Sequence, residues 1–149
     1  MLIHTMGAES SNPPWEGLSE AEIEALHEVE VGCEWLERAQ GHLLAFHHAV
    51  GHGMDHFAVA EDHLRDEGHP ELANHIRDEV LPCGVVDGDR WSYGLVEAYE
   101  DTMLAEVRRM GLMIREELAD GSRHVAERRQ RKQWRDRAKV SDTEGTGHR

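Results

Sequence analysis

The chain has 149 residues, of which 30 are acidic and 16 are basic, and its formal net charge is −14 at pH 7. This length suits a single domain, no apolar run approaches the roughly 18 residues that a membrane-spanning helix needs, and the first residues lack the pattern of a signal peptide. Two cysteines are too few for a disulfide scaffold. We therefore expect a cytoplasmic protein without a membrane-spanning segment.

The first helix is predicted from its start signal and its apolar spacing. Residues 1–18 indicate a poorly ordered N-terminal segment in which Trp15 packs back. A capping box of Ser19 and Glu22 then starts a helix, and apolar residues recur every seven positions along one face of it. These residues are Val29, Leu36, Leu43, Val50, Phe57 and Leu64. The apolar face keeps its phase, so we expect one long helix, with a break at Gly32 or Gly41 or a bend at Gly51–Gly53 as the alternatives.

Histidines are concentrated on one side of this expected helix, away from the apolar face. At about 100° per residue, they fall roughly 170° to 250° from the centre of the apolar face, and Glu34 lies in line with them. They are His48, His52, His56 and His63. Histidines four residues apart can share one cation. The alternative is a solvated flank, and His47, on another side, is expected to be a hydrogen-bonded packing residue.

The second half of the chain predicts a short helix and another long one. Gly68 favours the end of the first long helix, and Pro70 favours the start of the next one. The helix that follows is short, and Asp87-Gly88 after it indicates a turn. The long helix begins near Trp91, and Asp120-Gly121 interrupts it. Its expected apolar face consists of Val96, Tyr99, Met103, Val107, Met110, Ile114 and Leu118.

These elements predict an all-α fold in residues 19–121. We expect a long antiparallel helical hairpin with a short connecting helix, completed as a bundle by oligomerisation, because one hairpin cannot cover both apolar faces. If the long helices pair about the loop, opposing residue numbers sum to roughly 157. His56 then lies near Asp101.

Two carboxylates fall within the apolar faces. Glu61 and Glu100 either reach the bundle edge or need a partner or a metal ion. With Asp101 and the histidine side of the first helix, they form a candidate site for a transition metal such as Zn, Fe or Ni.

Residues 122–149 form a basic tail that we expect to be partly disordered. It holds 9 basic and 4 acidic residues, against 7 basic and 26 acidic residues before it. Its segment Arg123–Lys139 could bind nucleic acid, a membrane surface, or the acidic body of its own chain or of another chain. The rest of the chain is acidic and would repel phosphates, which disfavours nucleic-acid binding by that part.

The runs VGCEWLERAQGHLLAFHHAVGHGMDHFAVAEDHL and RDEVLPCGVVDGDRWSYGLVEAYED resemble uncharacterised small acidic all-α proteins of halophilic archaea. The likeness covers about Leu18 to Met110. It implies a helical architecture and a salt-rich habitat, and it supplies no catalytic residues.

No catalytic motif is present in the sequence, so we favour a non-enzymatic protein. The leading hypothesis is a helical interaction or assembly protein, homo-oligomeric and with an acidic, salt-adapted surface, which could also bind a protein partner. The alternatives are a bundle that stores, senses or uses a transition metal through the histidine-rich helix, and a protein that binds polyanions through its tail.

Overall fold

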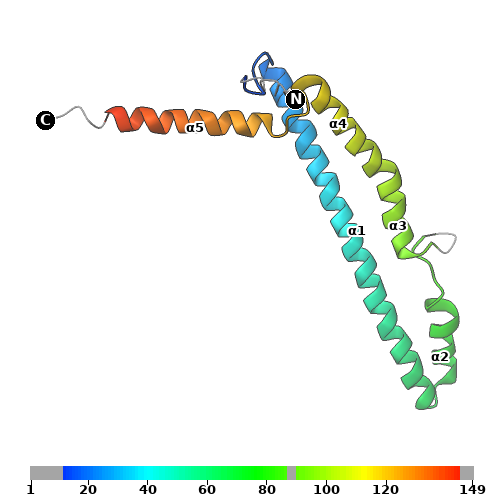
Figure 1. Ribbon diagram of the computed structural model, residues 1–149. Helices are drawn as coiled ribbons and strands as arrows, with labels where there is room; N and C mark the ends of the chain where they lie inside the picture. Colours follow the sequence, from blue (N-terminus) through cyan, green and yellow to red (C-terminus); the bar gives the residue numbers. More distant parts are fainter. Residues whose placement is uncertain (1–11, 87–89, 145–149) are drawn as a thin grey trace, which may run out of the picture. The chain divides into compact units, whose positions relative to one another are not determined.

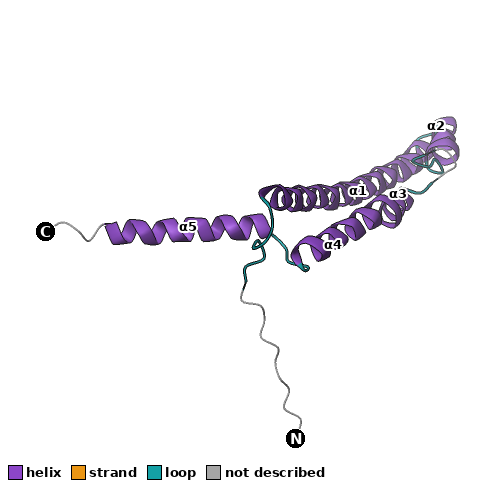
Figure 2. Cartoon of the chain, turned by 90° about the horizontal axis from the view of Figure 1, so that it is seen from above, coloured by secondary structure: helices purple, strands orange, loops and turns teal. Residues whose placement is uncertain are grey.

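The computed structural model describes residues 12–86 and 90–144, with side chains as far as residue 138. The elements are α1 (Glu20–Asp66), α2 (Pro70–His75), η1 (Ile76–Val80), α3 (Ser92–Tyr99), η2 (Glu100–Leu104), α4 (Ala105–Ala119) and α5 (Val125–Glu144), where η marks a π-helical turn. These described residues contain helices and no strand (Figures 1 and 2). The prediction of an all-α fold is confirmed. The predicted turn at Asp87-Gly88 lies outside the described residues.

Helix α1 begins at the predicted capping box. The Ser19 hydroxyl accepts from the Glu22 amide at 3.1 Å, and the Glu22 carboxylate accepts from the Ser19 amide at 3.2 Å. The helix then continues for 47 residues through Gly41, Gly51 and Gly53. The prediction of a single long helix is therefore confirmed, and the alternative of a break is wrong.

The end of α1 is also determined by residues that lie next to it in the sequence. Gly68 has a φ of +82°, a conformation that glycine adopts without steric cost. Its amide donates to the Arg65 carbonyl at 3.2 Å, and the His69 amide donates to the Leu64 carbonyl at 2.8 Å. This pair of bonds is a Schellman motif, which satisfies carbonyls left open by the helix end. Pro70 then occupies the first turn of α2, where its missing N–H costs nothing.

A second continuous helix runs from Ser92 to Ala119, because α3, η2 and α4 follow one another without a gap. The π-helical turn η2 inserts one extra residue into the helical repeat. After this turn, the buried positions therefore come one residue later in the sequence than a regular α-helix would place them. Leu104 and Gly111 are buried. Met103 and Met110, which the apolar spacing predicted on the inner face, are 58% and 37% exposed. That part of the predicted apolar face was wrong, since a regular helical period does not anticipate a π turn.

The helix ends at the predicted interruption. Asp120 has a φ of +48° and Gly121 a φ of +81°. These left-handed residues turn the chain sharply after α4. His124, just before α5, also has a positive φ, of +57°.

Contacts divide the chain into two compact units. Unit 1 comprises Met1–Cys33 and Arg109–Arg149, and unit 2 comprises Glu34–Arg108. The core of unit 1 is formed by Ile23, Leu26, Ala119 and Val125, with Trp15, Leu18, Ile114, Leu118 and Ala126 packed against it. The expected packing of Trp15 is confirmed, and the start of the basic tail belongs to this core.

Unit 2 has a small interior. Its buried hydrophobic residues, among those described, are Ala73, Val96 and Leu104. Polar contacts join α1 to the following helices: the Tyr99 hydroxyl donates to the Leu36 carbonyl at 2.7 Å, and Arg108 donates twice to Glu37, at 2.7 and 2.8 Å. His47 contacts Ser92 and Gln40 contacts Glu100, so the second helix runs antiparallel to α1 within this unit.

The register of this antiparallel pair differs from the prediction. His47 contacts Ser92 and Gln40 contacts Glu100, so the residue numbers of these opposing pairs sum to 139 and 140 and not to roughly 157. The reason is that the chain reverses at Gly68 and α2 runs back along α1, where Arg65 donates to Asn74 at 3.0 Å (Figure 1). The expected approach of His56 to Asp101 was therefore wrong, because Asp101 follows the residue that Gln40 contacts.

Candidate functional site

An apolar stripe is exposed on α1 within unit 2. It consists of Trp35, Phe46 and Phe57, which are 60%, 42% and 47% exposed. Successive members are eleven residues apart, which is about three helical turns plus 20°, so all three lie on nearly the same face. Their aromatic side chains thus leave exposed apolar surface at three levels along one face of the helix.

The apolar stripe is one flank of the apolar face predicted from the sequence. Residues on the other flank, including Leu36, Leu43 and Val50, are half-buried. In unit 2 the apolar face of α1 is thus wider than the side that its own chain covers.

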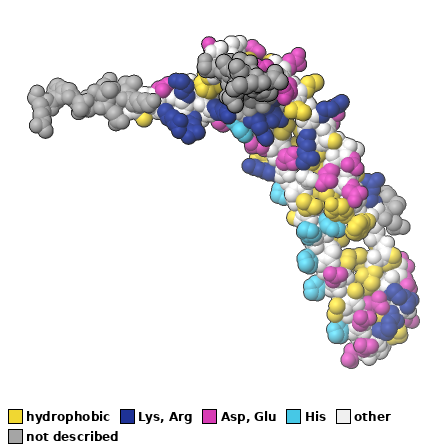
Figure 3. Space-filling view, viewed as in Figure 1, with side chains coloured by type: hydrophobic (Ala, Val, Ile, Leu, Met, Phe, Trp, Pro, Cys, Tyr) yellow, Lys and Arg dark blue, Asp and Glu magenta, His cyan; other side chains and the backbone are white. Residues whose placement is uncertain are grey.

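Acids are sparse around the Phe46 and Phe57 part of the apolar stripe, whereas Trp35 lies beside Glu34 and under the Arg38 guanidinium, 4.8 Å from its ring centroid. Between Arg38 and Ala60 the sequence contains one acidic residue, Asp55, although the chain as a whole carries 30. Histidines take the place of acids along this part of α1, and Figure 3 shows them in a row beside exposed hydrophobic side chains. A surface with few acids can approach another acidic protein at little electrostatic cost.

The predicted metal ligands on α1 are spread along the helix surface. His48, His52, His56, His63 and Glu34 are all exposed, as is Asp101. In the described part of the chain, no three of the predicted residues bring ligand atoms within 4.8 Å of one another, although three other residues do. Metal binding by the histidine-rich face stays a prediction.

Glu61 and Glu100 each have a polar partner in unit 2. The Glu61 side chain is 15% exposed and accepts from Arg65 at 3.1 Å. Glu100 is half-buried and accepts from Gln40. Each of these two carboxylates therefore has a hydrogen-bond partner within unit 2.

His47 is a packing residue, as predicted. Its Nδ1 lies 2.7 Å from the hydroxyl oxygen of Ser92, which is buried. Its ring also meets Tyr93 and Trp91 edge-on, with centroid distances of 5.1 and 5.7 Å. These contacts fix where α3 begins along α1.

A second candidate site lies in unit 1, where α1 and the start of α5 bring four side chains together. We call His27, Glu30, His124 and Glu127 the His–Glu cluster. His27 and Glu30 are three residues apart on α1, and His124 and Glu127 are three apart at the start of α5. His27 and Glu30 therefore share one face of α1, whereas His124 directly precedes α5 and Glu127 lies in the first turn of that helix.

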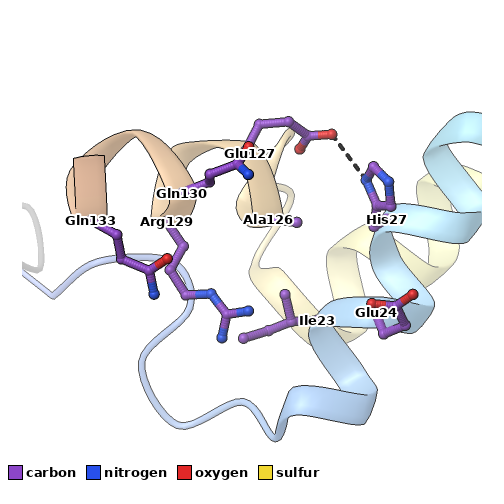
Figure 4. A pocket seen from close by; sticks show the side chains of 8 residues that line it. All are labelled: Ile23, Glu24, His27, Ala126, Glu127, Arg129, Gln130 and Gln133. Carbon is purple, nitrogen blue, oxygen red and sulfur yellow. Dashed lines mark hydrogen bonds and ion pairs between the residues drawn. The ribbon is translucent and has the colours of Figure 1, made fainter. Parts of the chain in front are cut away.

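The contacts within the His–Glu cluster are short. The His27 Nδ1 lies 3.0 Å from the Glu127 Oε1, and Figure 4 shows this pair joining the two helices beside a groove of about 260 Å³. The His124 amide donates to both oxygens of Glu30, at 3.0 and 3.2 Å, and the His124 Nδ1 lies 3.6 Å from Glu30 Oε2. Ligand atoms from Glu30, His124 and Glu127 all lie within 4.8 Å of one another.

The basic tail makes contacts of its own within unit 1. Its first part is the helix α5, on which Arg129 donates to Glu20 at 2.6 Å and Lys132 donates to Asp136 at 2.6 Å. The Arg129 guanidinium holds the pKa of Glu20 below its ordinary value, chiefly through this hydrogen bond. Arg128, Arg131 and other bases of α5 remain exposed.

Comparisons with known proteins supply no relative: no family model matches the chain, and no curated protein or solved structure matches it. Of the described helices, none is both long and apolar enough to cross a bilayer.

The sequence carried a signal for the His–Glu cluster that motif reasoning missed. His27 and Glu30 form a His-x-x-Glu pattern, and His124 and Glu127 repeat it near the other end of the chain. The repeat was not recognised because its second half lies in residues 122–149, which we expected to form a partly disordered tail outside the helical domain.

Proposed function

We propose that this protein is a non-enzymatic helical assembly protein that forms a homo-oligomer, the simplest being a dimer, through the apolar stripe on α1. The observation that carries the proposal is the exposure of Trp35, Phe46 and Phe57 along one face of a helix. A second copy would cover this face and convert two antiparallel helix pairs into a four-helix arrangement.

The charge distribution supports a second copy as the occupant. Two copies of a protein with a net charge of −14 repel each other unless they meet where acids are few. The part of α1 from Arg38 to Ala60 meets this condition, with its single acid. A two-fold symmetric contact centred on Phe46 and Phe57 places the same acid-poor surface on both copies, so this surface serves both sides of the interface.

The small interior of unit 2 gives a second argument. A helix pair with so few buried hydrophobic residues gains little hydrophobic stabilisation on its own. Burying three aromatic side chains per copy would add to it, since each aromatic residue carries a large apolar area. Salt screens the repulsion between the acidic surfaces that lie outside the interface on the two copies. This fits our expectation of a protein adapted to a salt-rich cytoplasm.

The test compares two substitutions on the same helix. Phe57→Glu places a charge in the stripe, while Val59→Glu places one at a position that is 54% exposed and about 160° away around α1. We expect light scattering after gel filtration to give the mass of one chain for Phe57→Glu and an oligomer for Val59→Glu and the unmodified chain. Equal masses for the two variants would refute the proposed interface, provided that circular dichroism shows equal helix content.

A further inference from the structure

We propose that the His–Glu cluster binds one divalent transition-metal ion per chain. The ligands would be Glu30, His124 and Glu127, with His27 as the residue that orients Glu127. This site is separate from the exposed histidine face of α1 and from the apolar stripe, and it lies wholly within unit 1.

The donor set favours this class of ion. Imidazole nitrogen combined with carboxylate oxygen suits Zn²⁺, Co²⁺, Fe²⁺ or Ni²⁺, whereas Ca²⁺ and Mg²⁺ prefer oxygen ligands alone. Two carboxylates also place two negative charges beside each other, and a divalent cation neutralises them.

The distances need only small side-chain movements. Four ligands around a zinc ion at about 2.0–2.1 Å are separated from one another by roughly 3.3 Å in a tetrahedral site. The His124 Nδ1 already lies 3.6 Å from Glu30 Oε2, and the three ligand atoms lie within 4.8 Å of one another. Glu127 is half-exposed, with 46% of its side chain accessible, so it can rotate toward the ion.

The backbone positions the ligands on both helices. Glu30 is held because both of its oxygens accept from the His124 amide, and its side chain is only 13% exposed. His124 is held in a left-handed conformation at the start of α5, directly before Val125, which is 1% exposed in the unit 1 core. His27 contacts one oxygen of Glu127 and leaves the other for the ion, as partners of metal-bound carboxylates do.

Three protein ligands leave a coordination position for water or for a further ligand. The His124 side chain is 51% exposed, so solvent reaches the cluster. Zinc sites with three protein ligands and an open position differ in this respect from closed structural sites with four.

The test is calorimetric titration of Zn²⁺ and Co²⁺ into the full chain carrying His48→Ala, His52→Ala, His56→Ala and His63→Ala, which removes the competing histidine face. We expect one ion per chain and no comparable binding of Ca²⁺. Glu127→Gln should weaken the binding at least tenfold, and His27→Ala by about tenfold or more, the range measured for residues that orient metal ligands.

Two matched variants separate a specific site from general attraction to acids. Glu24→Gln changes the same kind of side chain in the same groove outside the cluster (Figure 4), and it should leave the affinity unchanged. His124→Asn removes the imidazole and retains a residue that tolerates the positive φ, and it should abolish tight binding.

Thermal unfolding gives an independent readout. Zn²⁺ should raise the unfolding temperature of the chain with an intact cluster and leave that of Glu127→Gln unchanged, since a ligand of the folded state stabilises it. The proposal is overturned if the chain without the histidine face binds no ion, or if Glu24→Gln and Glu127→Gln bind equally well.

Discussion

The Nδ1 atom of His47 lies 2.7 Å from the hydroxyl oxygen of Ser92, the first residue of α3 and 3% exposed. This pair sets the register between α1 and α3 in unit 2, because the two residues come from facing helices. A buried hydroxyl that loses its partner destabilises the folded state by its full desolvation penalty.

We predict that His47→Phe lowers the free energy of unfolding by about 1–3 kcal/mol, the usual cost of leaving a buried hydroxyl unpaired. Phenylalanine retains ring contacts with Trp91 and Tyr93, so the change isolates the hydrogen bond. Urea denaturation followed by circular dichroism measures the effect. His48→Phe, at an exposed position, is the control.

The double substitution His47→Phe with Ser92→Ala should recover most of the loss, since both polar partners are then absent. If His47→Phe is no more destabilising than His48→Phe, the register does not depend on this contact.

Two glycines in long helices are expected to respond oppositely to alanine. A Cβ added at Gly41 meets no atom within 4 Å, so Gly41→Ala should stabilise the protein by up to about 1 kcal/mol through helix propensity. A Cβ added at Gly111 would lie 3.0 Å from the Cys33 Sγ, so Gly111→Ala should lose that gain or destabilise.

Thermal unfolding of these variants, and of Gly111→Ala combined with Cys33→Ala, checks the prediction. The double variant should exceed Cys33→Ala in stability, because removal of the sulfur makes room for the new methyl group. Equal stabilisation by Gly41→Ala and Gly111→Ala would contradict the close approach of α4 to α1 in unit 1.

The ion pair between Arg108 and Glu37 predicts a pH effect. Hydrogen bonds from the Arg108 guanidinium hold the pKa of Glu37 below its ordinary value of 4.5. The pair therefore stabilises the fold above pH 4.5, and its contribution is lost as the pH falls through the lowered pKa of the folded state.

Carbon-detected NMR titration of the Glu37 carboxyl tests this directly. The pKa should lie below 4.5 in the unmodified chain and rise toward that value in Arg108→Gln. Asp78 provides an internal reference, because its pKa is lowered by Arg77 and not by Arg108. An unchanged Glu37 pKa in Arg108→Gln would mean that the pair does not form in solution.

Local signals made most of the helices predictable. The Ser19 and Glu22 capping box, the Gly68 helix end and the Asp120-Gly121 interruption act within a few residues, so their effect on the backbone could be inferred from the sequence. The assignment of His47 to packing also followed from its position around the helix.

Features that depend on distant contacts were not predictable in the same way. The register of α1 with α3 depends on α2 running back along α1, and the phase of the second helix depends on the π turn at Glu100–Leu104. The His–Glu cluster joins residues about a hundred positions apart, through Val125 packing into the unit 1 core. None of these follows from periodicity.

Sedimentation equilibrium of the unmodified chain tests whether the protein self-associates through the apolar stripe of α1. We predict a mass of two or more chains that persists in low salt and becomes more stable as salt rises, because salt screens the acidic charge and strengthens apolar contacts. If the measured mass is that of one chain at every protein and salt concentration, the protein does not self-associate and the proposed dimer is wrong.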